Sequence, residues 1–310
     1  HEPVLTPSAA ERVFAEVWGQ DVMLELSIDG ELRSIYDLPE RGVRARTHGF
    51  VSELGLNMTL HVLERTVLAP AQLGLTAALH ALRDARWGLC VCSGPTGAGK
   101  TTTLWSLAQA LAAERAVHVV SLEQPIEMQL GGGLGLFDQR EVGRHVASYA
   151  EGIRWAVAQA ADVIVVGDLL APGALSACLA ALRTRCLVLA GVRASSSRKA
   201  LASLLSQADH AERARIELAA GLRVLLHQRL VPRAKGPGRV AAIEQLINTA
   251  QAAQLIRDDQ LQQLPALIAA SKGAGMVSLD DALDELVRAS SITRGSARHV
   301  ARRSERWESP

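Results

Sequence analysis

The hydrophobic and polar positions divide the chain into two regions with different periodicities. Up to about residue 75, an amphipathic helical stretch is followed by short strands, which is typical of a small α+β module. From about residue 86, short apolar runs alternate with stretches of helical periodicity. Strands and helices that alternate in this way form a largely parallel sheet. The pattern therefore predicts an α/β fold in which a small α+β domain precedes a larger domain with a parallel sheet.

In the N-terminal region, a helical pattern covers residues 8–18, with Ser8 as the predicted N-cap and Glu11 at the capping-box position. An Asp-Gly pair at 29–30 predicts a tight turn between two strands. The chain begins at His1 rather than Met, so we expect its natural start to lie upstream. The predicted strands of this region are residues 22–28, 31–33, 43–47 and 57–63.

In the larger region, strand and helix signals alternate up to about residue 206. The predicted strands are 88–92, 117–122, 162–166 and 186–191, and the predicted helices are 100–114, 147–160, 172–183 and 197–206. Beyond residue 210 the chain is helical apart from a strand pair near 222–232 and 239–247, and a capping box at Ser278 starts the last helix. We expect three parts: an N-terminal domain (1–75), a second domain (76–293), and an Arg/Ser-rich, frayed tail (294–310).

Composition and charge limit the classes of function. Hydrophobic residues make up 48% of the chain, which is enough for a sizeable core. The net charge is +1 and no long basic stretch occurs, so no nucleic-acid partner is indicated. No apolar run reaches the ~18 residues of a membrane span, and no signal-peptide pattern opens the chain, so we expect a cytoplasmic protein. The four cysteines lie in apolar runs, which favours small buried hydrophobic residues over metal or disulfide roles.

The segment between the predicted strand 88–92 and the predicted helix 100–114 matches the pattern G-x-x-x-x-G-K-[ST]. Its glycines let the backbone turn N–H groups toward a phosphate, and the following helix points its positive end at the same phosphate. Lys100 would reach the β- and γ-phosphates, and the Thr101 hydroxyl would bind Mg²⁺. The sequence therefore predicts a site for ATP or GTP rather than an ordinary glycine-rich turn. The residues of this site are Gly94, Pro95, Thr96, Gly97, Ala98, Gly99, Lys100, Thr101 and Thr102.

Two carboxylates end predicted strands of the same sheet. Hydrolysis of a nucleotide needs an acid there to hold Mg²⁺ or to polarise the attacking water. Asp168 follows the apolar strand 162–166, which we expect beside the strand of the phosphate loop, so its carboxylate would bind metal at the ligand-binding edge. Glu123 ends the strand 117–122 and is a second candidate for orienting or deprotonating water. The alternatives are a helix cap at Asp168 and an ordinary strand-end carboxylate at Glu123.

Two further patterns are less specific. The glycine run at 131–135 lacks a strand–loop–helix context, so it predicts a flexible hairpin tip rather than a second phosphate loop. Arg44 and Arg46 alternate along a predicted strand and share one face. They are either solvated surface charges or catalytic arginine fingers that reach the γ-phosphate from a neighbouring subunit. Their spacing leaves both alternatives open.

Together these motifs resemble the ATPases of type II secretion and type IV pili, most closely the PilT-like pilus-retraction type. The resemblance implies a PAS-like N-terminal domain joined to a RecA-like ATPase domain. It also implies ATP and Mg²⁺ as ligands, a ring of six identical or paralogous subunits, and attachment to an inner-membrane pilus or secretion platform. The short N-terminal part and the lack of a four-cysteine zinc site agree with the retraction type. The resemblance covers about Val43 to Ile292 and rests on the phosphate loop and on the motifs at 122–127, 139–143, 162–168, 254–258 and 275–280.

The chain departs from the family at positions close to the expected chemistry. Gln124 replaces the aspartate of a Glu-Asp-Pro motif, while Asp168 and Leu170 replace the glutamate and arginine of a Gly-Glu-Met-Arg-Asp motif. The shorter Asp168 would place its carboxylate about 1.5 Å short, and such a displacement can cost ~100-fold in rate. The other departures are Cys186 and Arg193 in place of two family histidines, and His61 in place of a third interface arginine beside Arg44 and Arg46.

Two functions therefore remain open from the sequence. The first is a working motor that hydrolyses ATP and moves its two domains relative to each other. The second is a homologue that binds ATP without turning it over and regulates or joins competent paralogues. A P-loop kinase or a DNA-handling ATPase lacks support, because no substrate domain and no basic stripe are present.

Overall fold

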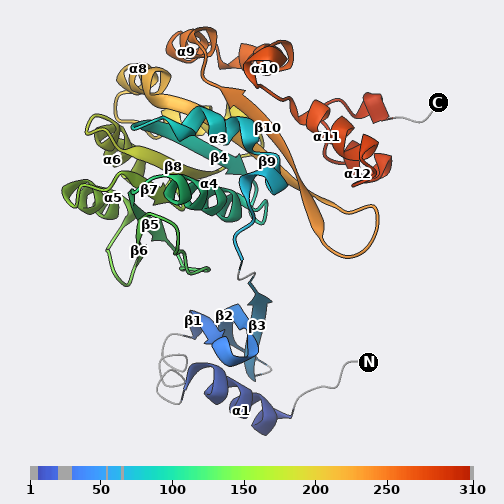
Figure 1. Cartoon of the computed structure of the whole chain (residues 1–310). Helices are drawn as coiled ribbons and strands as arrows, with labels where there is room; N and C mark the ends of the chain where they lie inside the picture. Colours follow the sequence, from blue (N-terminus) through green and yellow to red (C-terminus); the bar gives the residue numbers. More distant parts are fainter. Residues whose placement is uncertain (1–5, 20–29, 54, 64–65, 308–310) are drawn as a thin grey trace. The chain divides into compact units, whose positions relative to one another are not determined.

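The computed structural model describes residues 6–19, 30–53, 55–63 and 66–307 (Figure 1). The chain splits into two compact units. Unit 1 consists of His1–Thr66 and Gln124–Gln129, and unit 2 consists of Val67–Glu123 and Leu130–Pro310. Each unit has a sheet and a cluster of buried apolar residues of its own.

Unit 1 packs a helix, α1 (Pro7–Trp18), against an antiparallel sheet of β1 (Glu31–Leu38), β2 (Val43–Ser52) and β3 (Gly55–Val62), in that order. The helix buries Phe14 and Trp18. The Trp18 indole N–H donates to Ser34 Oγ and Thr47 Oγ1, at 2.8 Å each. Gly49 makes room for the ring, because a Cβ there would lie 2.1 Å from it. Apolar burial and a satisfied indole together hold α1 on the sheet.

The structure changes one detail of the predicted N-terminal helix. Thr6, rather than Ser8, caps α1, and its Oγ1 accepts from the Ala9 N–H at 3.3 Å. The helix starts earlier because Pro7 fits the first turn, where its missing N–H costs nothing. The strands predicted at 31–33, 43–47 and 57–63 are present with shifted bounds, whereas the one predicted at 22–28 lies outside the described residues.

Unit 2 is built on a seven-stranded sheet in the order β10-β9-β4-β8-β7-β5-β6. Every neighbouring pair is parallel except β9 with β10. The α/β fold predicted from the sequence is confirmed. The strands are β4 (Gly88–Gly94), β5 (His118–Glu123), β6 (Leu136–Glu141), β7 (Val163–Val166), β8 (Leu187–Arg193), β9 (Leu222–Pro232) and β10 (Arg239–Ile247).

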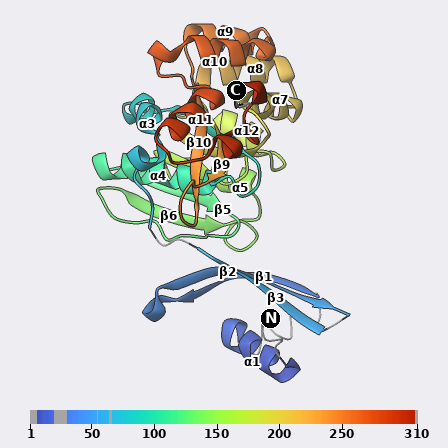
Figure 2. The same ribbon diagram turned by 90° about the vertical axis from the view of Figure 1, so that its right-hand side faces the viewer.

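Helices cover both faces of this sheet (Figures 1 and 2). On one face lie α3 (Thr76–Arg83) and α4 (Lys100–Glu114). The main apolar core lies on the other face. The inner strands β4 and β7 are buried at every position, because helices cover the sheet on both sides. In the described part of the chain, no helix is both long and apolar enough to cross a membrane. The helices of the second face and beyond it are α5 (Tyr149–Ala158), α6 (Ala174–Leu182), α7 (Ser197–Ser206), α8 (Ala211–Gly221), α9 (Ala250–Arg257) and α10 (Leu264–Ala270).

The strand order corrects one expectation about the site. β8 lies between β4 and β7, so the strand that precedes Asp168 does not neighbour the strand of the phosphate loop. The chain leaves β7, crosses over through α6, and returns as β8 into the place beside β4. Such an insertion depends on pairing between distant segments, which local periodicity does not encode.

The glycine run at 131–135 is not a hairpin tip, because it leads from β5 into β6 and these strands are parallel. Its N–H groups at Leu134 and Gly135 both donate to Ala112 O near the end of α4, at 2.9 and 3.1 Å. A Cβ at Gly135 would lie 2.7 Å from the Ala112 side chain. The glycines therefore allow a close backbone approach that satisfies a helix-terminal carbonyl. The sequence pattern also missed β6, a partly exposed edge strand.

The predicted frayed tail is instead folded. After α11 (Leu279–Arg288), which Ser278 caps as predicted, come α12 (Arg294–Arg298) and a 3₁₀ turn at Ser304–Trp307. Ala297 and Trp307 are buried, in one apolar cluster with residues of β9, β10 and α11. Figure 2 shows α11 and α12 beside β9 and β10. The prediction failed because a few buried apolar side chains, spaced among many arginines, are enough to hold this segment on the fold.

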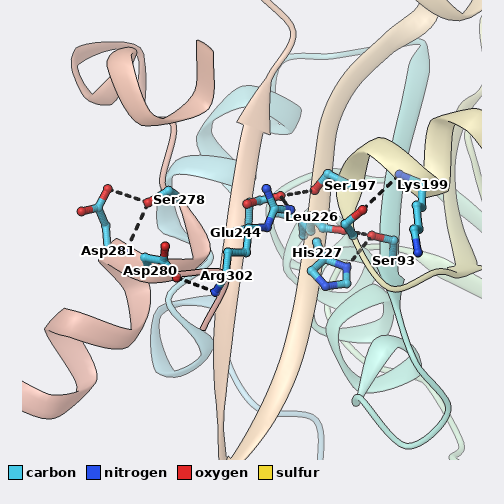
Figure 3. A network of polar contacts seen from close by, with 11 residues as sticks. Ser93, Ser197, Lys199, Leu226, His227, Glu244, Ser278, Asp280, Asp281 and Arg302 are labelled. Atoms are coloured by element: carbon cyan, nitrogen blue, oxygen red, sulfur yellow. Dashed lines mark hydrogen bonds and ion pairs between the residues drawn. The ribbon is translucent and has the colours of Figure 1, made fainter. Parts of the chain in front are cut away.

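A buried ion pair joins the C-terminal segment to the sheet (Figure 3). Glu244 on β10 is 1% exposed, and its Oε1 accepts from Ser197 Oγ at 2.6 Å and from Arg302 Nη2 at 2.7 Å. The Arg302 backbone N–H donates to Asp280 Oδ1 at 2.9 Å. One carboxylate thus connects α7, β10 and the segment after α12.

Candidate nucleotide-binding site

The predicted phosphate-binding loop joins the carboxyl end of β4 to the amino end of α4. Gly97 and Gly99 have φ values of 73° and 83°, in the left-handed region that favours glycine. Gly99 is the N-cap of α4, and no acidic residue occupies the first turn of the helix. The positive end of α4 therefore faces the loop without a competing carboxylate, as a phosphate site requires.

Lys100 is the first residue of α4, and its side chain folds back over the loop. Its Nζ donates to Gly94 O at 3.1 Å and to Pro95 O at 2.9 Å. Burial lowers the pKa of Lys100 from its ordinary value. Neutral carbonyls compensate a partly buried ammonium less well than an anion does, so a phosphate would be the better partner for this group.

Thr101 follows as the second residue of α4 and is half-buried. Among the described residues, no group of three or more His, Cys, Asp and Glu side chains could hold a metal ion. Mg²⁺ in nucleotide sites takes only one or two protein oxygens and completes its shell with phosphates and water. The Thr101 hydroxyl and the Asp168 carboxylate would supply oxygens of this kind.

Polar side chains from successive strands meet the carboxyl edge of the sheet beside the loop. Gly94 at the end of β4 pairs in register with Arg193 at the end of β8. Asp168 follows β7, and Glu123 ends β5. Two strand spacings, roughly 10 Å, separate β4 from β7. The predicted site residues of this unit thus lie along one edge, and Arg193 stands between the loop and the first acid.

Asp168 is tied to Arg193. Its Oδ2 lies 2.9 Å from Arg193 Nη2, and its Oδ1 accepts from the Leu170 N–H at 3.0 Å. The Arg193 side chain is 65% exposed, so this ion pair contributes little stability, about 0–1 kcal/mol. Asp168 does not cap the next helix, because Gly173 is the N-cap of α6. Two positions that depart from the family resemblance therefore contact each other.

Glu123 is buried at the end of β5. Its Oε1 accepts from Ser121 Oγ at 2.6 Å and from Gln139 Nε2 at 3.0 Å. Tyr149, the first residue of α5, lies near this edge as well. Burial raises the pKa of Tyr149 to about 12, and the charges of Asp168 and Glu123 act in the same direction. The bonds from Ser121 and Gln139 fix the Glu123 carboxylate in place, as a residue that orients water requires.

The strand β9 borders the loop strand on its other side. Ser93 Oγ, one residue before the loop, donates to Leu226 O at 2.9 Å and lies 3.1 Å from His227 Nδ1 (Figure 3). His227 is 1% exposed, and burial lowers its pKa to about 4. A neutral imidazole thus supports the base of the loop.

Arg44 and Arg46 lie in unit 1. Arg44 forms an ion pair with Asp37 and donates to Ile126 O and Glu127 O at 2.9 and 2.7 Å. Arg46 pairs with Glu127 at 2.7 Å, and 47% of its side chain is exposed. Arg44 is the more firmly held of the two, and Arg46 keeps the larger surface toward solvent.

The four cysteines are free and buried, and none of them contributes to the loop or to its acids. Burial raises the pKa of Cys92 and of Cys178 to about 12. These thiols therefore stay neutral and pack as small apolar groups.

Comparison with known proteins identifies the family of this chain. A family model described as "Type II/IV secretion system protein" matches residues 57–260, and the chain belongs to this family. Its relatives include pilus-retraction ATPases of the PilT type. It is 30% identical to the "Type IV pilus retractation ATPase PilT" of Pseudomonas aeruginosa over 266 residues, or 85% of this chain and 77% of the relative. It is also 32% identical to the "Uncharacterized protein YggR" of Escherichia coli over 287 residues, or 92% of this chain and 87% of that protein.

Solved structures agree with this placement. The crystal structure of the pilus retraction motor PilT with bound ADP superposes with a TM-score of 0.84 at 27% identity, covering 97% of this chain and 86% of that one. The ATPase DotB of Legionella pneumophila superposes with a TM-score of 0.83 at 20% identity, covering 97% and 85%, and shares the fold.

Sequence reasoning missed several residues that hold the site. His227 and Gln228 form a polar pair inside the apolar run of β9, and that interruption was the available signal. The sequence marks Arg193 as a replaced histidine, and its place just after a predicted strand is the signal that it lies at the ligand edge. Tyr149 carries no local signal, because only the tertiary fold brings α5 to the ends of β5 and β7.

Proposed function

We propose that this chain is an ATP-binding motor subunit of pilus-retraction or secretion machinery. The observation that carries the proposal is one sheet edge that holds a phosphate loop, an ammonium group and two carboxylates. The similarity to pilus and secretion ATPases supports the same function. The domains would be residues 1–75, 76–293 and the segment 294–310, and a nucleotide would occupy the loop at Gly94–Thr102.

The chemistry follows from the positions of the side chains. Lys100 would leave the carbonyls of Gly94 and Pro95 and bind the β- and γ-phosphates. Thr101 and Asp168 would hold Mg²⁺, which neutralises phosphate charge when bound. Asp168 must release Arg193 to do so, and the exposure of that pair makes the release inexpensive. Glu123 would orient or deprotonate the attacking water.

The assembly part of the proposal rests on the family resemblance. We place the chain in a ring of six identical or paralogous subunits, in which Arg44 or Arg46 of a neighbour stabilises charge on the γ-phosphate. Arg46 is the better candidate, because 47% of its side chain is exposed, whereas only 10% of the Arg44 side chain is exposed. The ring would be cytoplasmic and would act on a platform protein at the inner membrane.

A second candidate function is a homologue that binds ATP but does not turn it over. The observation that favours it is Asp168, which is shorter than the family's glutamate and already paired with Arg193. In the first case, Asp168→Glu combined with Leu170→Arg should raise turnover toward that of a competent motor. In the second case, the same double substitution should change nothing.

Steady-state ATP hydrolysis by the purified chain tests the proposal. Lys100→Ala should abolish turnover because it removes the phosphate-binding ammonium. Lys235→Ala is the matched control, since Lys235 is exposed on the turn between β9 and β10. Turnover that survives in Lys100→Ala would refute the assignment of the loop. Nucleotide binding without turnover in the wild-type chain would favour the second candidate.

A further inference from the structure

The side chain of Gln228, on β9, is buried against the phosphate loop. It forms one hydrogen bond to the loop and one to the helix that follows the loop. It is 2% exposed. Its Nε2 donates to Ala98 O in the loop at 2.7 Å, and its Oε1 accepts from Thr103 Oγ1 in α4 at 2.6 Å. One amide thus connects the loop to the first turn of the helix. The proposed chemistry does not use this residue.

The bond to Ala98 O fixes the orientation of a peptide plane. In a trans peptide the carbonyl and the following N–H point in opposite directions. With Ala98 O held toward Gln228, the Gly99 N–H is directed to the opposite side. A rotation of this plane would turn a carbonyl oxygen toward the place of the phosphate, and carbonyl and phosphate oxygens repel each other. The amide of Gln228 therefore selects the loop conformation that presents a donor to an anion.

The two outer glycines of the motif are also explained by Gln228. A Cβ at Gly94 would lie 2.6 Å from Gln228 O, and a Cβ at Gly99 would lie 2.8 Å from Gln228 Nε2. The backbone of Gln228 therefore packs closely against Gly94 at one end of the loop, and its side-chain amide packs closely against Gly99 at the other end. A side chain at either glycine would clash with Gln228.

We propose that Gln228 is a positioning residue of the nucleotide site, which holds the phosphate loop in its binding conformation without touching the nucleotide. This proposal rests on the proposed function, because it presumes that the loop binds ATP. Loss of the amide should weaken ATP binding at least about tenfold, because the loop must then be ordered at the expense of binding.

Gln228→Met tests the proposal, because methionine keeps the length and apolar volume of the side chain and lacks its amide. Gln245→Met is the matched control. Gln245 is also buried, at 3% exposed, and its Nε2 also donates to a loop carbonyl, Gly275 O at 2.7 Å, on the neighbouring strand β10. Calorimetric titration with Mg-ATP gives the dissociation constant, and thermal unfolding without nucleotide gives the stability.

We expect both variants to lose stability but only Gln228→Met to lose affinity. A merely structural amide would produce equal affinities in the two variants, and that result would overturn the proposal. If Gln228→Met does not fold, Thr103→Val decides the question, because it removes the donor that orients the amide. It should weaken ATP binding about threefold or more, and wild-type affinity would overturn the proposal. Absence of ATP binding by the wild-type chain would instead contradict the proposed function.

Discussion

Among the ion pairs of the described residues, the most deeply buried carboxylate is that of Glu244, and its partner is Arg302. Replacing Arg302 with methionine would remove this partner. Glu244 is 1% exposed, whereas the Arg302 side chain is 29% exposed. After the substitution, Ser197 Oγ would remain as a donor at 2.6 Å, but the carboxylate would lose the guanidinium with which it pairs. The C-terminal segment would also lose its polar attachment to β10.

The expected cost follows from the burial of the partner that remains. Breaking a buried ion pair from one side costs about 3–5 kcal/mol, because an uncompensated charge is left behind. Water can partly reach the vacated position of the half-exposed Arg302, so we expect about 3 kcal/mol, near the lower end. This is a large share of the roughly 5–15 kcal/mol by which a domain is stable.

Two further variants test whether the loss of stability comes from the buried charge of Glu244. Arg306→Met removes an arginine that pairs with Asp281 and Asp284, whose side chains are 21% and 18% exposed against 1% for Glu244, and it should cost less, about 1 kcal/mol. Adding Glu244→Gln to Arg302→Met should recover part of the lost free energy of unfolding, because the buried side chain at position 244 is then uncharged. Urea unfolding followed by circular dichroism measures all four proteins. Equal costs for Arg302→Met and Arg306→Met would refute the account of this pair.

Two other predictions concern His227 and Glu123. Because the pKa of His227 is about 4 when folded and about 6.5 when unfolded, the unfolded state binds more protons between these values. The free energy of unfolding should therefore fall by up to about 3 kcal/mol as the pH drops through this window, and His227→Gln should flatten the slope; an unchanged slope would contradict the assignment. Glu123→Gln keeps the size of the side chain and removes its charge, so ATP should still bind while turnover falls about 100-fold or more. Full turnover by this variant would exclude Glu123 as the group that activates water.

The sequence predicted the parts of the site that are local in the chain. The phosphate loop, its strand and its helix occupy one continuous segment, so spacing alone indicates their geometry. Asp168 and Glu123 were predicted because each follows an apolar strand. What local patterns could not give is the strand order, since β8 enters between β4 and β7 through pairings far apart in sequence. The contact between Asp168 and Arg193 depends on that order.

Other misses have equally specific causes. The C-terminal segment was expected to fray because arginine and serine dominate its composition, yet Trp307 and Ala297 are buried. Gln228 belongs to a strand that was predicted with its observed bounds, but the partner of its amide is 130 residues away in the loop. A polar residue inside an apolar strand indicates that some partner exists, and only the fold identifies it.

The most direct test of the account is the binding of Mg-ATP to the purified chain, measured at equilibrium beside Lys100→Ala. We expect saturable binding by the wild-type chain and loss of binding in the variant. The reason is that the Lys100 ammonium would exchange the loop carbonyls for the phosphates of the nucleotide, and the variant lacks this ammonium. Equal affinity in the two proteins, or no binding by either, would contradict the claim that Gly94–Thr102 holds the nucleotide.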